Sequence, residues 1–330
     1  MKKIFKDAVV RLYRLYRDNK WSIFEKKHDQ AYLRMLNQRM VETNESIYYV
    51  ISCENMPMQG LFGYVGLILG MIRYALEHNM VPVIDMKNYP NTYLEDNEVG
   101  QINAWELFFR QVSKVTIDDV YKSHSYVVGN HMDIDWKEMP NISGYHKKSS
   151  YFLWSNMYAR FVKLSEQAEK YCQEEFLQIL GEEKAEHTLG VLIRGTDIKT
   201  CKGHSLQPSL EQVTDKIRSV MKKDKQFQYI YLATEERMNE EYLREQFPGK
   251  VLINKRTYYD NADYVKGLSY VKMSGERDKY RRGMEYLSSM YILSKCGGLM
   301  SGQCGGGFAA FYMNGGKYRY DYFWELGVVE

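Results

Sequence analysis

The chain has 330 residues, of which 45% are hydrophobic and 26% are charged, and its formal net charge is +3. This length exceeds the usual size of one domain, so we expect two domains that share a cleft. The composition excludes a disordered or repetitive chain, and no segment approaches the ~18 apolar residues that a membrane span needs.

Residues 1–27 carry nine basic and three acidic side chains, a net charge of +6, and the remainder of the chain is then at −3. Phe5, Val9 and Leu12 recur at helical spacing with basic residues between them, so we predict a basic amphipathic helix over residues 1–30. Such a helix either lies on an anionic membrane surface or packs on its own domain, and both interpretations stay open. Nucleic acid is not an expected partner, because the basic residues do not continue into any nucleic-acid module.

The N-terminal half, residues 31–183, is predicted to contain a βαβ unit. A strand over residues 46–52, a glycine-containing loop, a helix over 65–78 and a strand over 81–85 follow one another within about forty residues. Residues 151–180 have helical periodicity and few helix breakers, so they are predicted to bridge the two halves.

The same alternation restarts in the C-terminal half, residues 184–330. Two halves of this kind predict an α/β fold with two Rossmann-type domains. The predicted strands span residues 188–193, 229–234, 251–254 and 298–301, and the predicted helices span 208–221, 237–247, 284–294 and 305–313.

Ligands of open α/β sheets bind beyond the carboxyl ends of the strands, and one such end carries Arg194, Gly195, Thr196 and Asp197. An arginine offers a planar fork of donors that fits phosphate oxygens. Gly195 would let the backbone approach the ligand, and Thr196 adds a hydroxyl. Asp197 could act as a base or orient Arg194, and the alternative to a site is an ordinary Arg–Asp pair.

Two further strand ends extend this prediction. Thr234 and Glu235 follow the next strand, where Glu235 either contacts a base or ribose or complements a helix N-terminus. Cys304, Gly305 and Gly306 lie in a glycine-rich loop before a helix, and free backbone amides there suit phosphate. We therefore expect a three-loop pocket for a diphosphate.

Several other residues are weaker candidates. His204 could donate to a phosphate or sugar hydroxyl. On the N-terminal side we expect Gly60, Gly63 and Tyr64 to face the cleft, while Trp105 either stacks on a sugar or belongs to the core. The Asp133-Ile-Asp135 segment mimics a metal-binding motif, but it follows no convincing strand and is interpreted as chance.

The five cysteines are Cys53, Cys172, Cys201, Cys296 and Cys304. They are odd in number, form no Cys-x-x-Cys pair and have no histidine cluster beside them, so neither disulfides nor zinc is indicated. The N-terminus also has no signal-peptide pattern. We therefore expect a cytoplasmic protein, peripheral on the membrane if the N-terminal helix binds lipid.

These loops, in this order, resemble the fucosyltransferase superfamily of α1,6-fucosyltransferases, nodulation fucosyltransferases and protein O-fucosyltransferases. The similarity spans roughly residues 46–327 and is most specific at Leu192-Ile-Arg-Gly-Thr-Asp197. It implies a GT-B-like fold that binds a GDP-sugar donor and transfers fucose with inversion to a glycan acceptor, without metal or cofactor. It also places the family's essential phosphate arginine on Arg194.

The chain departs from this family at several site positions. The family's second arginine is Gly195 here, so Arg194 would do most of the phosphate work. A guanine-reading aspartate of the family would fall near Ser289, and Glu285, one turn earlier on the same helix face, could substitute for it. The family's proposed base has no clear counterpart, which leaves Asp197. Another nucleotide-sugar donor, or a glycan- or nucleotide-binding protein without activity, therefore stays an alternative.

Overall fold

The computed structural model describes residues 46–56, 58–195, 202–259 and 277–329, together with residues 34, 271 and 275. The predicted helix over residues 1–30, and also Thr196, Asp197 and Cys201, lie outside the described residues.

The N-terminal half contains a parallel sheet of three strands in the order β2-β1-β3. The predicted strands at 46–52 and 81–85 are confirmed, whereas β3 was not predicted, because it is a strand of only four residues at the edge of the sheet. The predicted helix between them begins earlier than expected, since Gly60, in an extended conformation, is its N-cap. The elements are β1 (Tyr48–Ser52), α3 (Leu61–Glu77), β2 (Val81–Asp85) and β3 (Tyr126–Gly129).

The C-terminal half contains a parallel sheet of five strands in the order β6-β5-β4-β7-β8. Its first strand in the sequence therefore lies in the middle, as in a Rossmann domain, and the strand order reverses between β4 and β7. All four predicted strands are present, and β8 is an addition. The strands are β4 (Thr188–Ile193), β5 (Tyr229–Thr234), β6 (Val251–Leu252), β7 (Gly298–Gly302) and β8 (Tyr320–Trp324).

The four helices predicted in this half are also present. Ser209 caps α10, because its hydroxyl accepts from the N–H of Gln212 and the Gln212 side chain accepts from the N–H of Ser209. α12 begins six residues before the predicted start. The helices are α10 (Leu210–Lys223), α11 (Arg237–Gln246), α12 (Asp278–Lys295) and α13 (Gly305–Met313).

The predicted helical bridge over residues 151–180 is two helices, α7 (Lys148–Phe161) and α8 (Glu166–Ile179). The chain between them pairs with a distant segment: the N–H of Arg110 donates to the carbonyl of Lys163, and the N–H of Ser165 donates to that of Phe108. Ser165 then caps α8. A long-range pairing of this kind leaves no signal in local periodicity.

The remaining elements are short. Asp135 accepts from the backbone N–H of Lys137 and caps a turn. These elements are α4 (Ala104–Phe108), α5 (Ile117–Ser123), α6 (Ser143–His146), α9 (Gly181–Ala185), η1 (Asp96–Glu98), η2 (His131–Asp133) and η3 (Trp136–Glu138).

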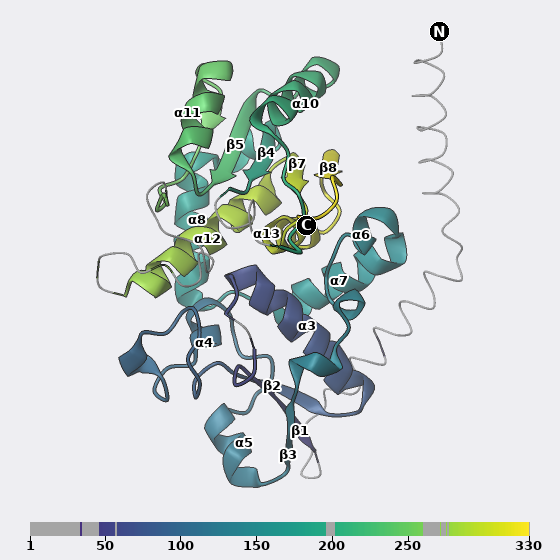
Figure 1. The fold of residues 1–330 in the computed structure, drawn as a ribbon, viewed down its shortest axis with the longest axis vertical. Coiled ribbons are helices and arrows are strands. Elements are labelled where there is room, and N and C mark those ends of the chain that lie inside the picture. The colour runs from purple at the N-terminus through teal and green to yellow at the C-terminus, as the bar shows by residue number, and fades with distance from the viewer. Residues whose placement is uncertain are drawn as a thin grey trace.

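The helices α3, α12 and α13 lie between the two sheets (Figure 1). One continuous apolar core includes Ile68 of α3, Leu192 of β4 and Leu293 of α12. The hydroxyl of Tyr312 on α13 also donates to the carbonyl of Asn141, 2.5 Å away. The sheets are therefore joined by shared packing as well as by the chain.

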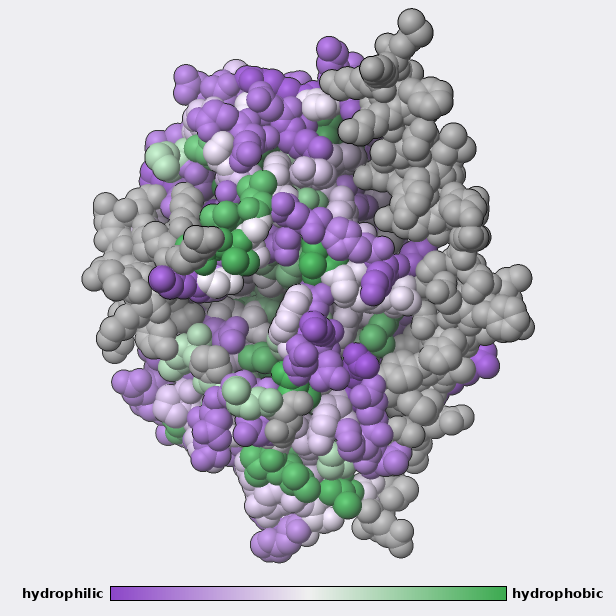
Figure 2. All heavy atoms as spheres, turned by 45° about the vertical axis from the view of Figure 1, so that its right-hand side comes forward, coloured by the Kyte–Doolittle hydropathy of each residue, from purple (hydrophilic) through white to green (hydrophobic). Residues whose placement is uncertain are grey.

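The molecular surface is mainly hydrophilic on the face in Figure 2, and hydrophobic side chains gather there in separate patches. Val127 and Val128 of β3 are both about half exposed, because β3 is an edge strand that pairs with β1. Among the described residues, no helix is long and apolar enough to cross a bilayer.

Candidate functional site

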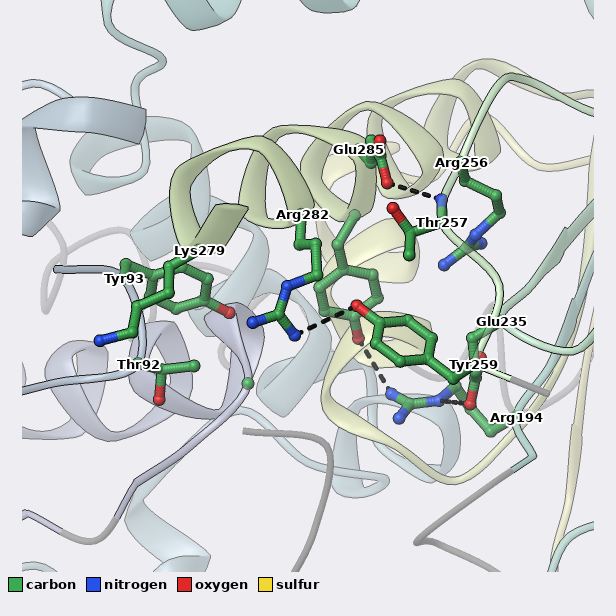
Figure 3. A pocket seen from close by; sticks show the side chains of 12 residues that line it. Thr92, Tyr93, Arg194, Glu235, Arg256, Thr257, Tyr259, Lys279, Arg282 and Glu285 are labelled. Atoms are coloured by element: carbon green, nitrogen blue, oxygen red, sulfur yellow. Dashed lines mark hydrogen bonds and ion pairs between the residues drawn. The ribbon is translucent and has the colours of Figure 1, made fainter. Parts of the chain in front are cut away.

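A pocket opens at the carboxyl ends of β4, β5 and β6 and is closed on the other side by α12 (Figure 3). Four basic side chains and two acidic ones line it, so its walls favour an anionic ligand. Both halves of the chain contribute to the lining, which consists of Gly60, Thr92, Tyr93, Arg194, Glu235, Arg256, Thr257, Tyr259, Lys279, Arg282, Glu285 and Tyr286.

Arg194 is held in this pocket by Glu235. The Nε of Arg194 donates to Oε1 of Glu235 at 2.8 Å, and the backbone N–H of Gly195 donates to the same oxygen at 2.9 Å. Burial raises the pKa of Glu235, but the positive charges of Arg194 and Arg256 lower it by more than burial raises it. The pKa therefore lies below its ordinary value of 4.5. Glu235 is therefore a fixed anion that orients Arg194, and it also lines the pocket.

The space beside the Cα of Gly195, where the resembled family has a second arginine, is filled in this structure. A Cβ on Gly195 would lie 2.0 Å from Cδ of Glu236, because the Glu236 carboxylate occupies that space. Asn239 in turn donates to this carboxylate at 3.0 Å. A side chain at position 195 would therefore require the Glu236 carboxylate to move; the φ of Gly195 is not in the left-handed region.

Tyrosines surround the arginines of the pocket. Nη1 of Arg194 donates to the hydroxyl of Tyr286 at 3.4 Å, and the guanidinium lies 5.8 Å from the ring centre. Burial raises the pKa of Tyr286 to about 12, so its hydroxyl stays protonated at neutral pH. On the opposite wall, Nη1 of Arg282 donates to the hydroxyl of Tyr259 at 3.3 Å, and its Nη2 donates to the carbonyl of Val271.

The two residues predicted to contact a purine base differ in their placement. Glu285 lines the pocket, but one of its oxygens accepts from the N–H of Thr257 at 2.7 Å and the other from Nη1 of Arg281 at 2.8 Å. Ser289 is fully buried, and its hydroxyl donates to the carbonyl of Glu285 and to Asn254. The prediction that Ser289 contacts the donor does not fit this position, because its side chain points into the protein core.

The glycine-rich loop lies beside the pocket without lining it. Cys304 is buried and caps α13, with its Sγ accepting from the N–H of Gly307 at 3.4 Å. A Cβ on Gly306 would meet the Tyr286 hydroxyl at 2.4 Å, and one on Gly305 would meet the carbonyl of Phe62 at 3.2 Å. Tyr286 therefore stands between the α13 N-terminus and Arg194, and α3 packs against that terminus.

Of the residues predicted to face the acceptor, Gly60 lines the pocket. Tyr64 is buried, with its hydroxyl 3.9 Å from Sδ of Met58. Trp105 is 2% exposed and its Nε1 donates to the carbonyl of Arg110, so it belongs to the core and offers no face to a sugar. Gly63 packs on the side chain of Gln59.

The two remaining donor candidates, Thr234 and His204, lie away from the pocket. Thr234 is fully buried, and its hydroxyl accepts from Nδ2 of Asn239 at 2.9 Å, so it fixes the start of α11. His204 is exposed, and its carbonyl accepts from the N–H of Val329. Neither residue lines the pocket, which corrects both predictions.

Sequence reasoning missed most of the pocket, since only Gly60, Arg194, Glu235 and Glu285 of its lining residues were predicted. Arg256, Thr257 and Tyr259 follow β6, which was predicted as a strand, so the strand-end rule applied once more would have found them. Lys279 and Arg282 lie on the first turns of α12, which precede its predicted start. Among the described residues, no group of three His, Cys, Asp or Glu side chains is placed to bind a metal ion.

No family model matches this chain, and no curated protein sequence matches it significantly. Solved structures are similar to it at low sequence identity. Fucosyltransferase NodZ from Bradyrhizobium is 15% identical, with a TM-score of 0.47 over 82% of this chain and 93% of NodZ. POFUT1 in its apo form is 11% identical, with a TM-score of 0.47 over 87% of this chain and 100% of POFUT1.

A variant of FUT1 from Arabidopsis thaliana, in complex with GDP, is 11% identical, with a TM-score of 0.45 over 91% of this chain and 76% of FUT1. NodZ has also been crystallised with GDP and soaked with GDP-fucose. NodZ is an α1,6-fucosyltransferase.

Proposed function

We propose that this protein is an inverting, metal-independent glycosyltransferase that transfers fucose from GDP-fucose to a glycan acceptor. The observation that carries the proposal is Arg194, a strand-end arginine whose guanidinium is fixed by a buried carboxylate in a cationic pocket. A pre-oriented guanidinium is suited to a diphosphate, because it neutralises the charge that develops on the leaving group.

The two halves would form a GT-B-like pair of domains, with boundaries near residues 31–183 and 184–330. Support comes from the two separate parallel sheets and from the lining of the pocket. Gly60, Thr92 and Tyr93 come from the N-terminal half, and the other lining residues come from the C-terminal half. In this proposal the donor binds to the C-terminal wall and the acceptor approaches along the N-terminal one.

In the proposed reaction, an acceptor hydroxyl attacks the anomeric carbon of the donor and the bond from that carbon to the diphosphate oxygen breaks. Arg194 donates to the departing diphosphate, whose two phosphates carry the negative charge. Asp197, four residues beyond β4, takes the proton from the acceptor hydroxyl. Attack from the face opposite the leaving group inverts the anomeric centre.

A second candidate is the same reaction with a different nucleotide sugar. The observation that favours it is Glu285, whose two oxygens already accept from Thr257 and Arg281. A carboxylate that reads guanine accepts from the N1–H and amino group of the base with its two oxygens, and here each oxygen already accepts from the protein, which reduces its capacity for a base.

Calorimetry with GDP, UDP and ADP tests these proposals directly. GDP binding that is at least ~10-fold tighter than UDP or ADP binding, with slow hydrolysis of GDP-fucose, is the expected result. Preference for another nucleotide would support the second candidate. Binding of GDP without turnover of any donor, in a mass-spectrometric screen against glycan acceptors, would contradict the enzyme proposal and indicate a binding protein.

The acceptor is proposed to be a surface polysaccharide or a lipid-linked oligosaccharide. The support is the basic segment of residues 1–27, which would place a cytoplasmic enzyme on an anionic membrane surface.

A further inference from the structure

Arg256 differs from the other arginines that line the pocket. Its Nε and Nη1 are buried, yet within the described part of the chain no group accepts a hydrogen bond from either nitrogen. Arg194 and Arg282, by contrast, both donate to protein groups. In Figure 3 the guanidinium of Arg256 points into the pocket, between Thr257 and Glu235, and no dashed line reaches it.

A buried, charged donor without an acceptor destabilises a protein, because it has lost its hydration and gained nothing in return. Such groups are rare in folded proteins, and one that faces a pocket indicates a ligand that supplies the missing acceptors. For a guanidinium with Nε and Nη1 unpaired, the matching ligand is an oxyanion that accepts from both nitrogens at once.

The loop that carries Arg256 is held on both sides of it. Before Arg256, Asn254 accepts from the hydroxyl of Tyr231 at 2.7 Å and donates to Ser288 at 3.1 Å. After it, the N–H of Thr257 donates to Glu285 at 2.7 Å, and the N–H of Tyr259 donates to the carbonyl of Glu235 at 3.0 Å. The unpaired guanidinium therefore sits on a rigid segment, as a pre-organised binding group does.

The balance of charge around Arg256 also indicates an anion. Glu235 is a buried carboxylate whose pKa burial alone would raise, but Arg194 and Arg256 together lower it. It accepts from Arg194 and from the N–H of Gly195. The pocket as a whole is lined by four basic and two acidic side chains, so its charge favours an anionic ligand.

We propose that Arg256 is a second phosphate-binding arginine of the pocket, whose Nε and Nη1 donate to the diphosphate that Arg194 also contacts. This inference rests on the proposed function for its ligand, a nucleoside diphosphate. Arg194 and Arg256 follow different strands, β4 and β6, on either side of β5, so they would grip the diphosphate from two sides.

The test is calorimetry on the full chain with GDP, guanosine and inorganic pyrophosphate, comparing the wild type with Arg256→Gln and Arg256→Lys. Arg256→Gln should bind GDP and pyrophosphate on the order of 10- to 100-fold more weakly, while guanosine binding changes by less than about 2-fold. Arg256→Lys keeps the charge but loses the fork, and it should recover only part of the affinity. Lys255→Gln is the matched control, since Lys255 is exposed on the same loop, and it should bind GDP like the wild type.

The melting temperature of the ligand-free protein distinguishes a ligand-binding role of Arg256 from a structural one. Removing an unpaired buried charge should leave the melting temperature of the ligand-free protein unchanged or raise it by a few degrees, roughly. If Arg256 had a structural role, Arg256→Gln would lower the melting temperature.

Unchanged GDP and pyrophosphate affinity in Arg256→Gln would overturn the inference while leaving the proposed function standing. A wild-type protein that binds pyrophosphate through Arg256 but no nucleotide would overturn the proposed function and leave the anion site. If the wild type binds neither, both proposals fail.

Discussion

Nε of Arg194 and Oε1 of Glu235 lie 2.8 Å apart, and the Arg194 side chain is only 14% exposed. The residues come from neighbouring strand ends, because Ile193 pairs with Thr234 in the β4–β5 register. Either charge alone in this buried position would destabilise the folded protein, because a buried charge needs a partner. Their pairing fixes both the direction of the guanidinium and the charge of the pocket.

Replacement of Arg194 should abolish most of the proposed activity. Arg194→Ala should reduce kcat by about 10²- to 10³-fold, the usual effect of removing a group that stabilises a leaving charge. Arg194→Lys should recover little, because one ammonium cannot donate to Glu235, to Tyr286 and to a phosphate in the same directions. Steady-state kinetics with the preferred donor give the answer, and normal turnover in Arg194→Ala would sink the assignment.

Glu235→Gln should remove a pH-dependent part of the stability. The pKa of Glu235 is lowered in the folded protein, so its ionisation stabilises the fold above about pH 4.5, and this contribution disappears as the pH falls through the lowered pKa. Urea unfolding should therefore show Glu235→Gln less stable than the wild type by about 1–3 kcal/mol at pH 7. The difference should shrink below pH 4.5, and a constant difference from pH 7 to pH 4 would contradict it.

Gly195→Ala should destabilise the protein by about 1–3 kcal/mol, because the new Cβ would overlap the Glu236 carboxylate. The double variant with Glu236→Ala should regain much of that loss, and a double-mutant cycle by urea unfolding measures the coupling. Gly66→Ala serves as the control. Gly66 lies in α3 with no atom near its Cβ position, so alanine there should stabilise by about 0.5–1 kcal/mol. Additive effects of the Gly195 and Glu236 changes would show that the overlap does not matter.

Neutralising Arg11, Arg14 and Arg17 together with glutamine tests the basic segment of residues 1–27. If it binds anionic lipid, affinity for phosphatidylserine vesicles should fall by roughly 100-fold, at about 1 kcal/mol per charge, and wild-type binding should weaken as salt is raised. A control variant with Lys222, Lys223 and Lys225 changed to glutamine loses the same charge from an exposed part of the described chain. Equal losses in the two triple variants would refute a specific role for the segment.

Sequence periodicity predicted the strands of the C-terminal sheet well because they are buried on both faces. The strand Thr188–Ile193 has no exposed residue, and after Thr188 it contains no polar side chain. β3 and β8 were missed because they are edge strands with mixed burial, and their pairing with β1 and β7 is a long-range property. The break between α7 and α8 was missed for the same reason.

The candidate site was predictable only where its residues follow the carboxyl ends of the parallel strands, where ligands of open α/β sheets bind. This strand-end rule located Arg194 and Glu235, but it could not show that Glu235 binds Arg194, because the contact spans 41 residues of sequence. It also could not separate side chains that face the pocket from those that face the core. Thr234 and Ser289 point inward, and Trp105 does so as well, although each has a residue type that suits a ligand.

The apolar core that includes Ile68 and Leu293 runs without interruption from the N-terminal sheet to the C-terminal one. Unfolding of either half would expose the side chains that the other half packs against along α3, α12 and α13, so we expect the two halves to unfold together. Heat should then melt the described part of the chain in a single cooperative transition, with calorimetric and van't Hoff enthalpies in agreement. A destabilising substitution in either half would then lower the melting temperature of both halves together.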